Sequence, residues 1–455
     1  MFLYVKCFFN SFNFIVVIKY LRTHFYILLL IVVSDINAQS TSNNITIHDS
    51  LNKKHWGYET DFQIGRVLKL DKYQKAYMKE SQDYSLTFKL NHISLPSDSD
   101  SYAYDYHYPT FSIVGKFSKN NSASMHREYN FPHWNYLTDD YFEIAPYNTH
   151  LGNSFALFGS FSYPILRNRK WELNLSGNLG LAYSSKKYDK KSSVDNDMIG
   201  SHLLFYAGGG VSATYRILHS WGIKAGLDYW HISNGSTKQP NRSVNVFGPT
   251  LGLVYYPYYH HLLTTQNKFI PNQFHPYWYI NIKGGIGIKT CFEDWERTQY
   301  CLNKSHPDWR TEDFTIYSVA SIQTDLMYRY ARIGSIGFGF DIQYSSCYSH
   351  IKEIDESRSP PVYCKHSPWS VALDAKHTLF YGNVSFILGA GIYLLRNMGD
   401  YSNRKEPIFF NRIGVHYTIP KLYNITLGIE VKAHLTNADF TEFVMSYPLN
   451  FKQIK

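Results

Sequence analysis

The chain has 455 residues, of which 44% are hydrophobic and 17% aromatic, and its formal net charge is +9. The mean hydropathy of −0.32 argues against a protein built from membrane-spanning helices, which need stretches of about 20 apolar residues. With 40 Tyr and 28 Gly, the composition fits a transmembrane β-barrel, whose strands alternate and are never continuously apolar. It fits a soluble all-β protein equally well.

Residues 1–38 are predicted to be a signal peptide with an N-terminal extension. Lys19 and Arg22 precede an apolar run at 25–33, and the sequence SDINA follows it, with Ala38 as the expected cleavage point before Gln39. This order is that of a secretory signal peptide, and the run is too short to cross a bilayer. The alternative is a membrane anchor. After cleavage we expect a short polar leader, 39–56, to begin the exported chain.

Sixteen segments of the exported chain alternate between apolar and polar residues and are mostly bounded by turn residues, so each is predicted to be a strand. They are 57–70, 82–93, 107–118, 150–164, 171–185, 199–217, 221–233, 244–257, 276–289, 314–331, 333–346, 368–378, 383–395, 408–419, 423–436 and 438–451. A connection at 258–275 separates a first half, 57–257, from a C-terminal half, 276–455.

The connections between these segments alternate in length. Long polar loops such as 119–147, 184–197 and 290–312 alternate with mostly tight turns, a pattern typical of outer-membrane barrels. We therefore predict an all-β fold, a transmembrane antiparallel β-barrel of about 16 strands in the outer membrane. The alternatives are an eight-stranded barrel followed by a second barrel module, and a soluble sandwich with irregular loops.

The segment 221–233 indicates which side chains face lipid. Its odd-numbered positions are Trp221, Ile223, Ala225, Leu227, Tyr229, His231 and Ser233. Its even-numbered positions are Gly222, Lys224, Gly226, Asp228, Trp230 and Ile232. The apolar face of a barrel strand meets lipid and the polar face meets the lumen. His231 and Ser233 therefore fall on the lipid face, at the long-loop end of the strand.

Asn245 faces the same way at the start of the next predicted strand. Three polar side chains thus converge where the surface should be apolar, which is unfavourable unless they hydrogen-bond to one another. A serine, a histidine and a third polar residue form the usual arrangement that activates a serine nucleophile. The alternative interpretation is that they simply lie at the lipid–water boundary.

The same stretch resembles the active site of the lipid A 3-O-deacylase (PagL-type) family. The matching features are HISNG at 231–235, PN after four more residues, and Asn245 on the next strand. The resemblance extends from about Leu151 to Tyr256 and includes LGNSFALF at 151–158. The C-terminal 190 or so residues contain no motif of this family that we can place.

The resemblance implies an outer-membrane barrel enzyme that removes an ester-linked acyl chain from lipid A and needs no cofactor. By position, Ser233 matches the nucleophile and His231 the general base, while Asn234 or the Gly235 amide would hold the oxyanion. Asn245 stands where the family has a carboxylate. An amide oxygen can orient the imidazole but cannot offset its positive charge. The alternative function is a non-catalytic barrel, either a pore or an inactive lipid-binding relative.

The resemblance implies lipid A, or lipopolysaccharide, in the outer leaflet as the partner. The net positive charge of an exported chain independently favours phosphorylated lipids over nucleic acid. Four lysines in one long loop are candidates to contact the lipid A phosphates, or they belong to a solvated loop. They are Lys186, Lys187, Lys190 and Lys191.

Four cysteines remain after removal of the segment that contains Cys7, and all four fall in predicted extracellular loops. They are Cys291, Cys301, Cys347 and Cys364. An even number in an exported chain predicts disulfides, with three possible connectivities. The pairs nearest in sequence are Cys291–Cys301 and Cys347–Cys364. The spacing is not that of a zinc site, so no metal is expected.

Overall fold

The computed structural model describes residues 55–450 except for ten short gaps. The gaps are 71, 128–130, 136–139, 145–146, 195, 264–267, 303–304, 358–360, 401–406 and 436. The predicted signal peptide at 1–38 and nearly all of the predicted leader at 39–56 therefore lie outside the described residues. No helix among the described residues is both long enough and apolar enough to cross a membrane.

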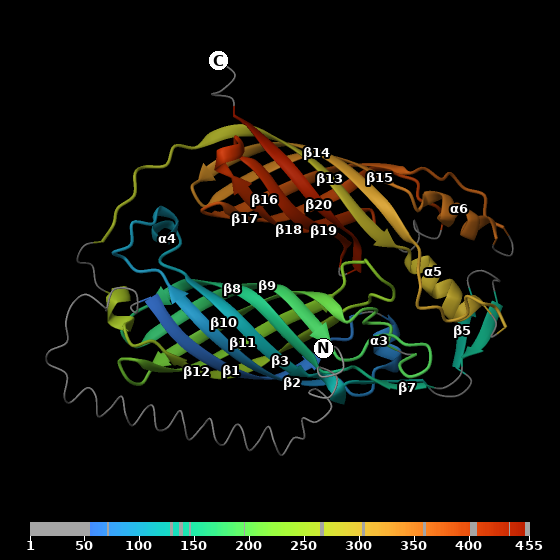
Figure 1. The fold of residues 1–455 in the computed structure, drawn as a ribbon, viewed down its shortest axis with the longest axis horizontal. Helices are drawn as coiled ribbons and strands as arrows, with labels where there is room; N and C mark the ends of the chain where they lie inside the picture. Colours follow the sequence, from blue (N-terminus) through green and yellow to red (C-terminus); the bar gives the residue numbers. More distant parts are fainter. Residues whose placement is uncertain are drawn as a thin grey trace. The chain divides into compact units, whose positions relative to one another are not determined.

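Eight antiparallel strands close into an N-terminal barrel (Figure 1). They are β1 (Trp56–Val67), β2 (Gln82–Ile93), β3 (Thr110–Lys119), β8 (Ser154–Arg167), β9 (Trp171–Ser184), β10 (Leu203–Arg216), β11 (Trp221–Ser233) and β12 (Val244–Tyr255). Each of these eight strands pairs with the next one named, so that β3 pairs with β8 across the inserted β4–β7, and β12 returns to pair with β1, with Tyr255 opposite Tyr58. The return of β12 to β1 leaves this sheet without an open edge.

Eight further antiparallel strands close into a C-terminal barrel in simple chain order, with β20 paired to β13 (Figure 1). They are β13 (Tyr277–Thr290), β14 (Ile316–Ala331), β15 (Gly334–Ser345), β16 (Trp369–Tyr381), β17 (Val384–Arg396), β18 (Phe409–Ile419), β19 (Ile425–His434) and β20 (Asn437–Asn450). The sixteen predicted strands are thus confirmed. They close as two eight-stranded barrels, which is the alternative arrangement, because β12 completes a closed sheet before β13 begins.

Large apolar side chains cover the outer surface of both barrels, as the predicted facing requires. Exposed examples are Ile113 and Leu251 in the N-terminal barrel and Ile286, Ile322 and Phe443 in the C-terminal barrel. In water such a surface would be unfavourable, whereas in a bilayer it matches the hydrocarbon. The exterior is therefore that of two membrane-spanning barrels.

Buried charged side chains fill both lumens. In the N-terminal barrel, Lys116 Nζ lies 3.0 Å from Asp228 Oδ2 and 2.8 Å from Gln63 Oε1. In the C-terminal barrel, Arg412 Nη2 donates to Asp341 Oδ2 at 2.7 Å, and Lys432 reaches the same carboxylate at 3.1 Å. Charges removed from water are tolerated when they are paired and hydrogen-bonded in this way.

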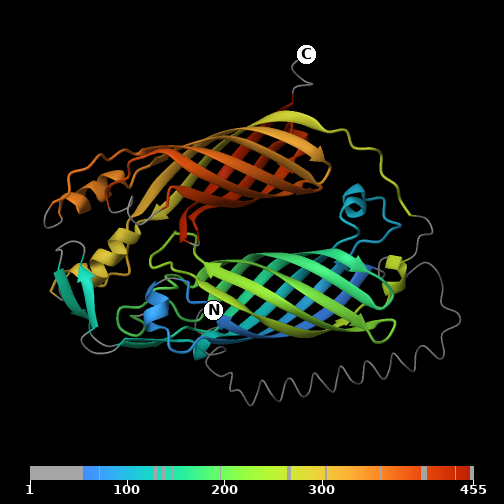
Figure 2. The ribbon, with the colours of Figure 1, turned by 180° about the vertical axis from the view of Figure 1, so that it is seen from behind.

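The connections between the barrel strands carry helices and small sheets that the sequence did not predict. The helices are α3 (Lys72–Tyr77), α4 (Ser101–Asp105), α5 (Phe292–Glu296) and α6 (Tyr348–Glu356), and the short helical turns are η2 (Asn120–Ser122), η3 (Tyr259–Leu263), η4 (Arg297–Cys301) and η5 (Pro420–Leu422). Two-stranded sheets pair β4 (Ser124–Arg127) with β7 (Tyr147–His150) and β5 (Phe131–Asn135) with β6 (Asp140–Ile144). Figure 2 shows α5 and α6 at the same end of the C-terminal barrel, where its long loops lie.

Candidate active site

Strand β11 carries His231 and Ser233 on its outward face. Ile223 and Leu227, at the same parity, are exposed, whereas Lys224 on the opposite face is buried in the lumen. His231 is half-buried, and only 7% of Ser233 is exposed. Both residues lie where β11 ends and the loop 234–243 begins.

Strand β12 brings Asn245 directly opposite His231 in the antiparallel register. Phe247 and Leu251 share its parity and are exposed, so Asn245 lies on the outer face of the barrel wall. Its own side chain is only 1% exposed. The register thus places the three polar side chains on one patch of the outer wall.

These side chains form one continuous chain of hydrogen bonds. His231 Nε2 lies 2.9 Å from Ser233 Oγ, and His231 Nδ1 lies 2.8 Å from Asn245 Oδ1. Tyr229 donates its hydroxyl proton to the same Asn245 oxygen at 2.7 Å, and Asn245 Nδ2 donates to Ser243 Oγ at 3.0 Å. With its nitrogen held by Ser243, the amide turns its oxygen to the imidazole. Nδ1 of a neutral ring then carries the proton, and Nε2 is left to accept from the serine hydroxyl.

Two members of this network, Tyr229 and Ser243, were not predicted from the sequence. Tyr229 has the same parity as His231, two residues earlier on β11, and an outward tyrosine near the membrane boundary would have been a usable signal. Ser243 has no such signal, because it precedes β12 in a left-handed conformation with φ 65°. Its contact with Asn245 depends on the path of the loop rather than on strand periodicity.

Asn234 forms hydrogen bonds within the loop that follows Ser233. The Asn234 amide N–H donates to Asn241 Oδ1 at 2.9 Å, and its side-chain Nδ2 donates to the carbonyl oxygen of Lys238 at 2.7 Å. Asn234 is 2% exposed. Gly235 follows with φ +64°, a left-handed conformation that suits glycine. Both of these Asn234 N–H donors are therefore engaged within the loop.

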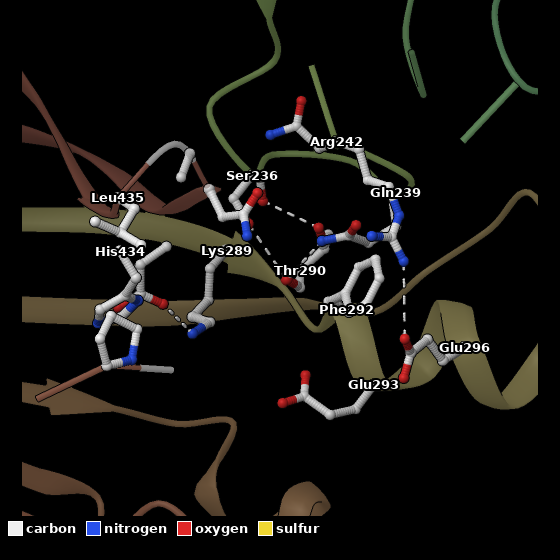
Figure 3. Close-up of a pocket in the computed structure, with 15 residues that line it drawn as sticks. Ser236, Gln239, Arg242, Lys289, Thr290, Phe292, Glu293, Glu296, His434 and Leu435 are labelled. Atoms are coloured by element: carbon white, nitrogen blue, oxygen red, sulfur yellow. Dashed lines mark hydrogen bonds and ion pairs between the residues drawn. The ribbon is translucent and has the colours of Figure 1, made fainter. Parts of the chain in front are cut away.

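The same loop contacts the C-terminal barrel. Thr441 Oγ1 donates to the Gly235 carbonyl oxygen at 2.8 Å, and Gln239 Nε2 donates to the Thr290 carbonyl oxygen at 3.1 Å. A cavity of about 220 Å³ lies beside these contacts, lined by Arg242 and Lys289 among others (Figure 3). Both cations have carboxylate partners, because Lys289 donates to Asp439 and Arg242 Nε lies 2.7 Å from Asp197.

The four candidate lysines differ in their surroundings. Lys187 Nζ lies 2.7 Å from Glu312 Oε2 and also donates to the Tyr188 carbonyl oxygen at 3.1 Å. Lys186, Lys190 and Lys191 are exposed. The ion pair of Lys187 leaves the three exposed lysines as the more accessible cations of this loop.

The described cysteines are not paired as expected from their nearness in sequence. Cys291, Cys347 and Cys364 are free thiols, so neither expected bridge is present in this structure. Cys347 precedes α6, where it packs against Cys291 at the start of α5. Helix α6 then carries the chain away from Cys347 before Cys364 is reached. The side chain of Cys301 lies outside the described residues.

Models of known protein families match both halves of the chain. The model of the lipid A 3-O-deacylase (PagL) family matches residues 107–254, and that of the acyloxyacyl hydrolase C-terminal domain matches residues 278–452. The second match covers the half in which the sequence offered no motif we could place. No curated protein matches the chain.

Solved outer-membrane barrels are similar at low identity. The outer membrane enzyme PagL is 14% identical, with 43% of this chain and 98% of that chain covered and a TM-score of 0.25. Pseudomonas aeruginosa OpdK, solved with vanillate, is 9% identical, with 87% of this chain and 99% of that chain covered and a TM-score of 0.20. The NanC porin is 6% identical, with 86% and 98% covered and a TM-score of 0.14.

Proposed function

We propose that the chain hydrolyses an acyl ester of lipid A with Ser233 as its nucleophile, because the lipid A 3-O-deacylase (PagL) model matches residues 107–254 and the acyloxyacyl hydrolase C-terminal domain model matches residues 278–452. The protein is a β-barrel protein of the outer membrane. The observation that carries the proposal is the hydrogen-bonded chain from Ser233 through His231 to Asn245 on the outer wall. Only a serine on that wall can reach an ester in the surrounding leaflet.

In the proposed reaction, Ser233 Oγ attacks the carbonyl carbon of the acyl ester while His231 Nε2 takes the hydroxyl proton. The Gly235 amide would donate to the developing oxyanion. The bond between the carbonyl carbon and the sugar oxygen then breaks, and His231 returns the proton to that oxygen. A water molecule, deprotonated by His231, attacks the acyl-serine, releases the fatty acid and restores Ser233. Throughout, Asn245 holds the imidazole in the tautomer that the first step requires.

Small residues next to the site support binding of an acyl chain. Ala207 and Gly209 on β10 lie opposite His231 and Tyr229, and Gly177 on β9 lies opposite Gly209. A Cβ atom built on Gly177 would meet no atom within 4 Å. We propose that an acyl chain lies along these small residues, where each methylene removed from water contributes about 0.8 kcal/mol. The exposed Lys186, Lys190 and Lys191 are the cations that we propose for the lipid A phosphates.

The second candidate is an inactive, lipid-binding relative, which Asn245 favours because its amide cannot offset the imidazolium charge. A pore is the weaker form of this alternative. The cavity lined by Asp61, Lys89, Lys116 and Asp228 in the N-terminal barrel measures about 30 Å³, room for roughly one water molecule.

Mass spectrometry of lipid A from cells that contain the intact protein or its Ser233→Ala variant tests the proposal. We expect loss of one ester-linked acyl chain with the intact protein and unchanged lipid A with Ser233→Ala. Ser192→Ala, on an exposed loop of the same barrel, serves as the matched control and should retain activity. If lipid A is unchanged in cells that contain the intact, folded protein, the hydrolase proposal fails and the inactive, lipid-binding alternative is supported.

A further inference from the structure

Three side chains with electron-rich atoms meet in the loops of the C-terminal barrel, far from Ser233 in sequence. His366 Nε2 lies 2.9 Å from Asp355 Oδ2, and Cys364 Sγ lies 3.6 Å from His366 Nε2 and 3.7 Å from Asp355 Oδ2. Asp355 belongs to α6, whereas Cys364 and His366 precede β16. The three ligand atoms lie within 4.8 Å of one another.

The hydrogen bonding of His366 turns a lone pair toward this meeting point. Its Nδ1 lies 3.0 Å from the carbonyl oxygen of Cys364, an atom that can only accept. Nδ1 therefore carries a proton, and Nε2 of the neutral ring presents its lone pair to Asp355 and Cys364. A histidine that donates one ring N–H to a backbone carbonyl while its other nitrogen faces anionic ligands has the usual setting of a metal ligand. Only a cation, a proton or a metal ion, makes this arrangement favourable.

The separations match those around a tetrahedral zinc ion. Bonds of about 2.0–2.2 Å to nitrogen and oxygen and about 2.3 Å to sulfur place neighbouring ligand atoms roughly 3.3–3.6 Å apart. The two distances to Cys364 Sγ fall in or next to this range, and the third lies a few tenths of an ångström below it. A cation between Asp355 and His366 would separate them by that small amount.

The backbone after β17 leaves room for the cluster. A Cβ atom built on Gly399 would lie 2.7 Å from Asp355 Oδ2 and 3.0 Å from His366 Nε2. The Asp400 amide donates to the same Asp355 oxygen at 2.8 Å, which fixes the orientation of the carboxylate. Asp355 and the His366 side chain are buried, whereas Cys364 is exposed. The cluster is therefore open to solvent on its cysteine side.

We propose that Asp355, Cys364 and His366 bind one zinc ion or a similar divalent transition metal, with solvent in the fourth position. Thiolate and imidazole ligands select such metals, whereas Ca²⁺ and Mg²⁺ prefer oxygen alone. The bound ion links α6 to the segment before β16 and, through Asp400, to the loop after β17. Cysteine spacing did not predict this site, because only one cysteine takes part and its partners are Asp355 and His366. The proposal does not depend on the hydrolase function.

The test measures metal bound to the full-length protein in detergent, after treatment with chelator and addition of Zn²⁺ alone. We expect one zinc ion per chain by elemental analysis, and a thiolate charge-transfer band when Co²⁺ replaces Zn²⁺. Cys364→Ser and His366→Gln should each weaken binding more than tenfold. His350→Gln is the matched control, since His350 Nε2 also faces a carboxylate, that of Asp294, but lies outside the proposed site.

A second control variant removes the thiols of Cys291 and Cys347, which lie outside the proposed site. Cys291→Ser combined with Cys347→Ser should leave both the stoichiometry and the Co²⁺ band unchanged. Gly399→Ala keeps all three ligands but puts a methyl group against two of them, so it should also weaken binding. Binding that survives Cys364→Ser, or that disappears with the Cys291 and Cys347 substitutions, would overturn the proposal. So would peptide mapping that finds Cys364 in a disulfide.

Discussion

Asn245→Asp tests whether an amide can complete the proposed triad. The substitution keeps the shape of the side chain and replaces its neutral oxygen with a carboxylate. Three donors surround this position, namely the Tyr229 hydroxyl, His231 Nδ1–H and the hydroxyl of Ser243, which can rotate to donate. A buried carboxylate with three donors is tolerated. We therefore expect Asn245→Asp to fold and to stabilise the imidazolium that forms when Ser233 attacks.

The expected gain in kcat for Asn245→Asp depends on how much of the role of a carboxylate Asn245 already performs. In serine proteases the change from Asp to Asn costs about 10⁴ in turnover, mostly because the wrong histidine tautomer results. Here the bond from Asn245 Nδ2 to Ser243 holds the amide oxygen toward His231, so the correct tautomer is already favoured. The remaining gain is the difference between a neutral and a charge-assisted hydrogen bond, about 1–1.5 kcal/mol. Asn245→Asp should thus raise kcat about tenfold.

Asn245→Ala should have the opposite effect, because it leaves the imidazole without an orienting acceptor. General-base catalysis contributes about 10²–10⁴ in rate, and we expect a loss of at least 10². The assay is fatty-acid release from lipopolysaccharide by protein in mixed micelles, with heat-modifiable migration as the check on folding. A folded Asn245→Ala variant as active as the natural protein would refute the positioning role of Asn245. A folded Asn245→Asp variant of lower kcat would refute the estimate of its gain.

Three further predictions concern the barrel wall, the cysteines and the lumens. Gly177→Phe should raise KM for lipid A, because its ring would occupy the wall along which we propose the acyl chain to lie. Gly284→Phe, at an equally open position on the C-terminal barrel, should leave KM unchanged, and equal effects would contradict an acyl-chain site. The hydrogen bond from Cys291 lowers the pKa of the Cys347 thiol below its usual value, which favours thiolate chemistry between the two. Under oxidising conditions these two cysteines should form a disulfide in non-reducing peptide maps, and a bridge from either one to another cysteine would contradict this. Planar bilayers containing the protein should show no steady conductance, because ion pairs fill both lumens. Stable channel steps would instead support the alternative function of a pore.

Strand periodicity was enough to predict most of the strands, because the two faces of each strand meet different surroundings. The alternation in 221–233 predicted both the bounds of β11 and the outward direction of His231 and Ser233. Periodicity says which way a side chain points but not which strands close a sheet. The pairing of β12 with β1 therefore could not be distinguished in advance from one barrel of sixteen strands.

Contacts made by loops were beyond the reach of sequence patterns. Ser243 reaches Asn245 only because of the path of the loop 234–243. Asp355 and Cys364 come together because α6 and the segment before β16 fold back on each other, although a C-x-H spacing at 364–366 was visible in the sequence. Cys347 was expected to pair with Cys364, but α6 begins directly after Cys347 and instead leaves it beside Cys291.

The size of the barrels explains why the proposed chemistry lies on the outer wall. A barrel of eight strands has an interior just wide enough to be filled by its own side chains, and Lys116, Asp228 and Gln63 fill this one. A substrate with several acyl chains cannot enter such a lumen, whereas its ester lies naturally beside the wall of a protein in the same leaflet. At the end of β11, a hydrogen-bonded Ser–His–Asn chain can stay close to the polar headgroups while the acyl chain follows the apolar wall below. The closed eight-stranded sheet therefore restricts the proposed catalysis to its outer surface, where His231, Ser233 and Asn245 lie.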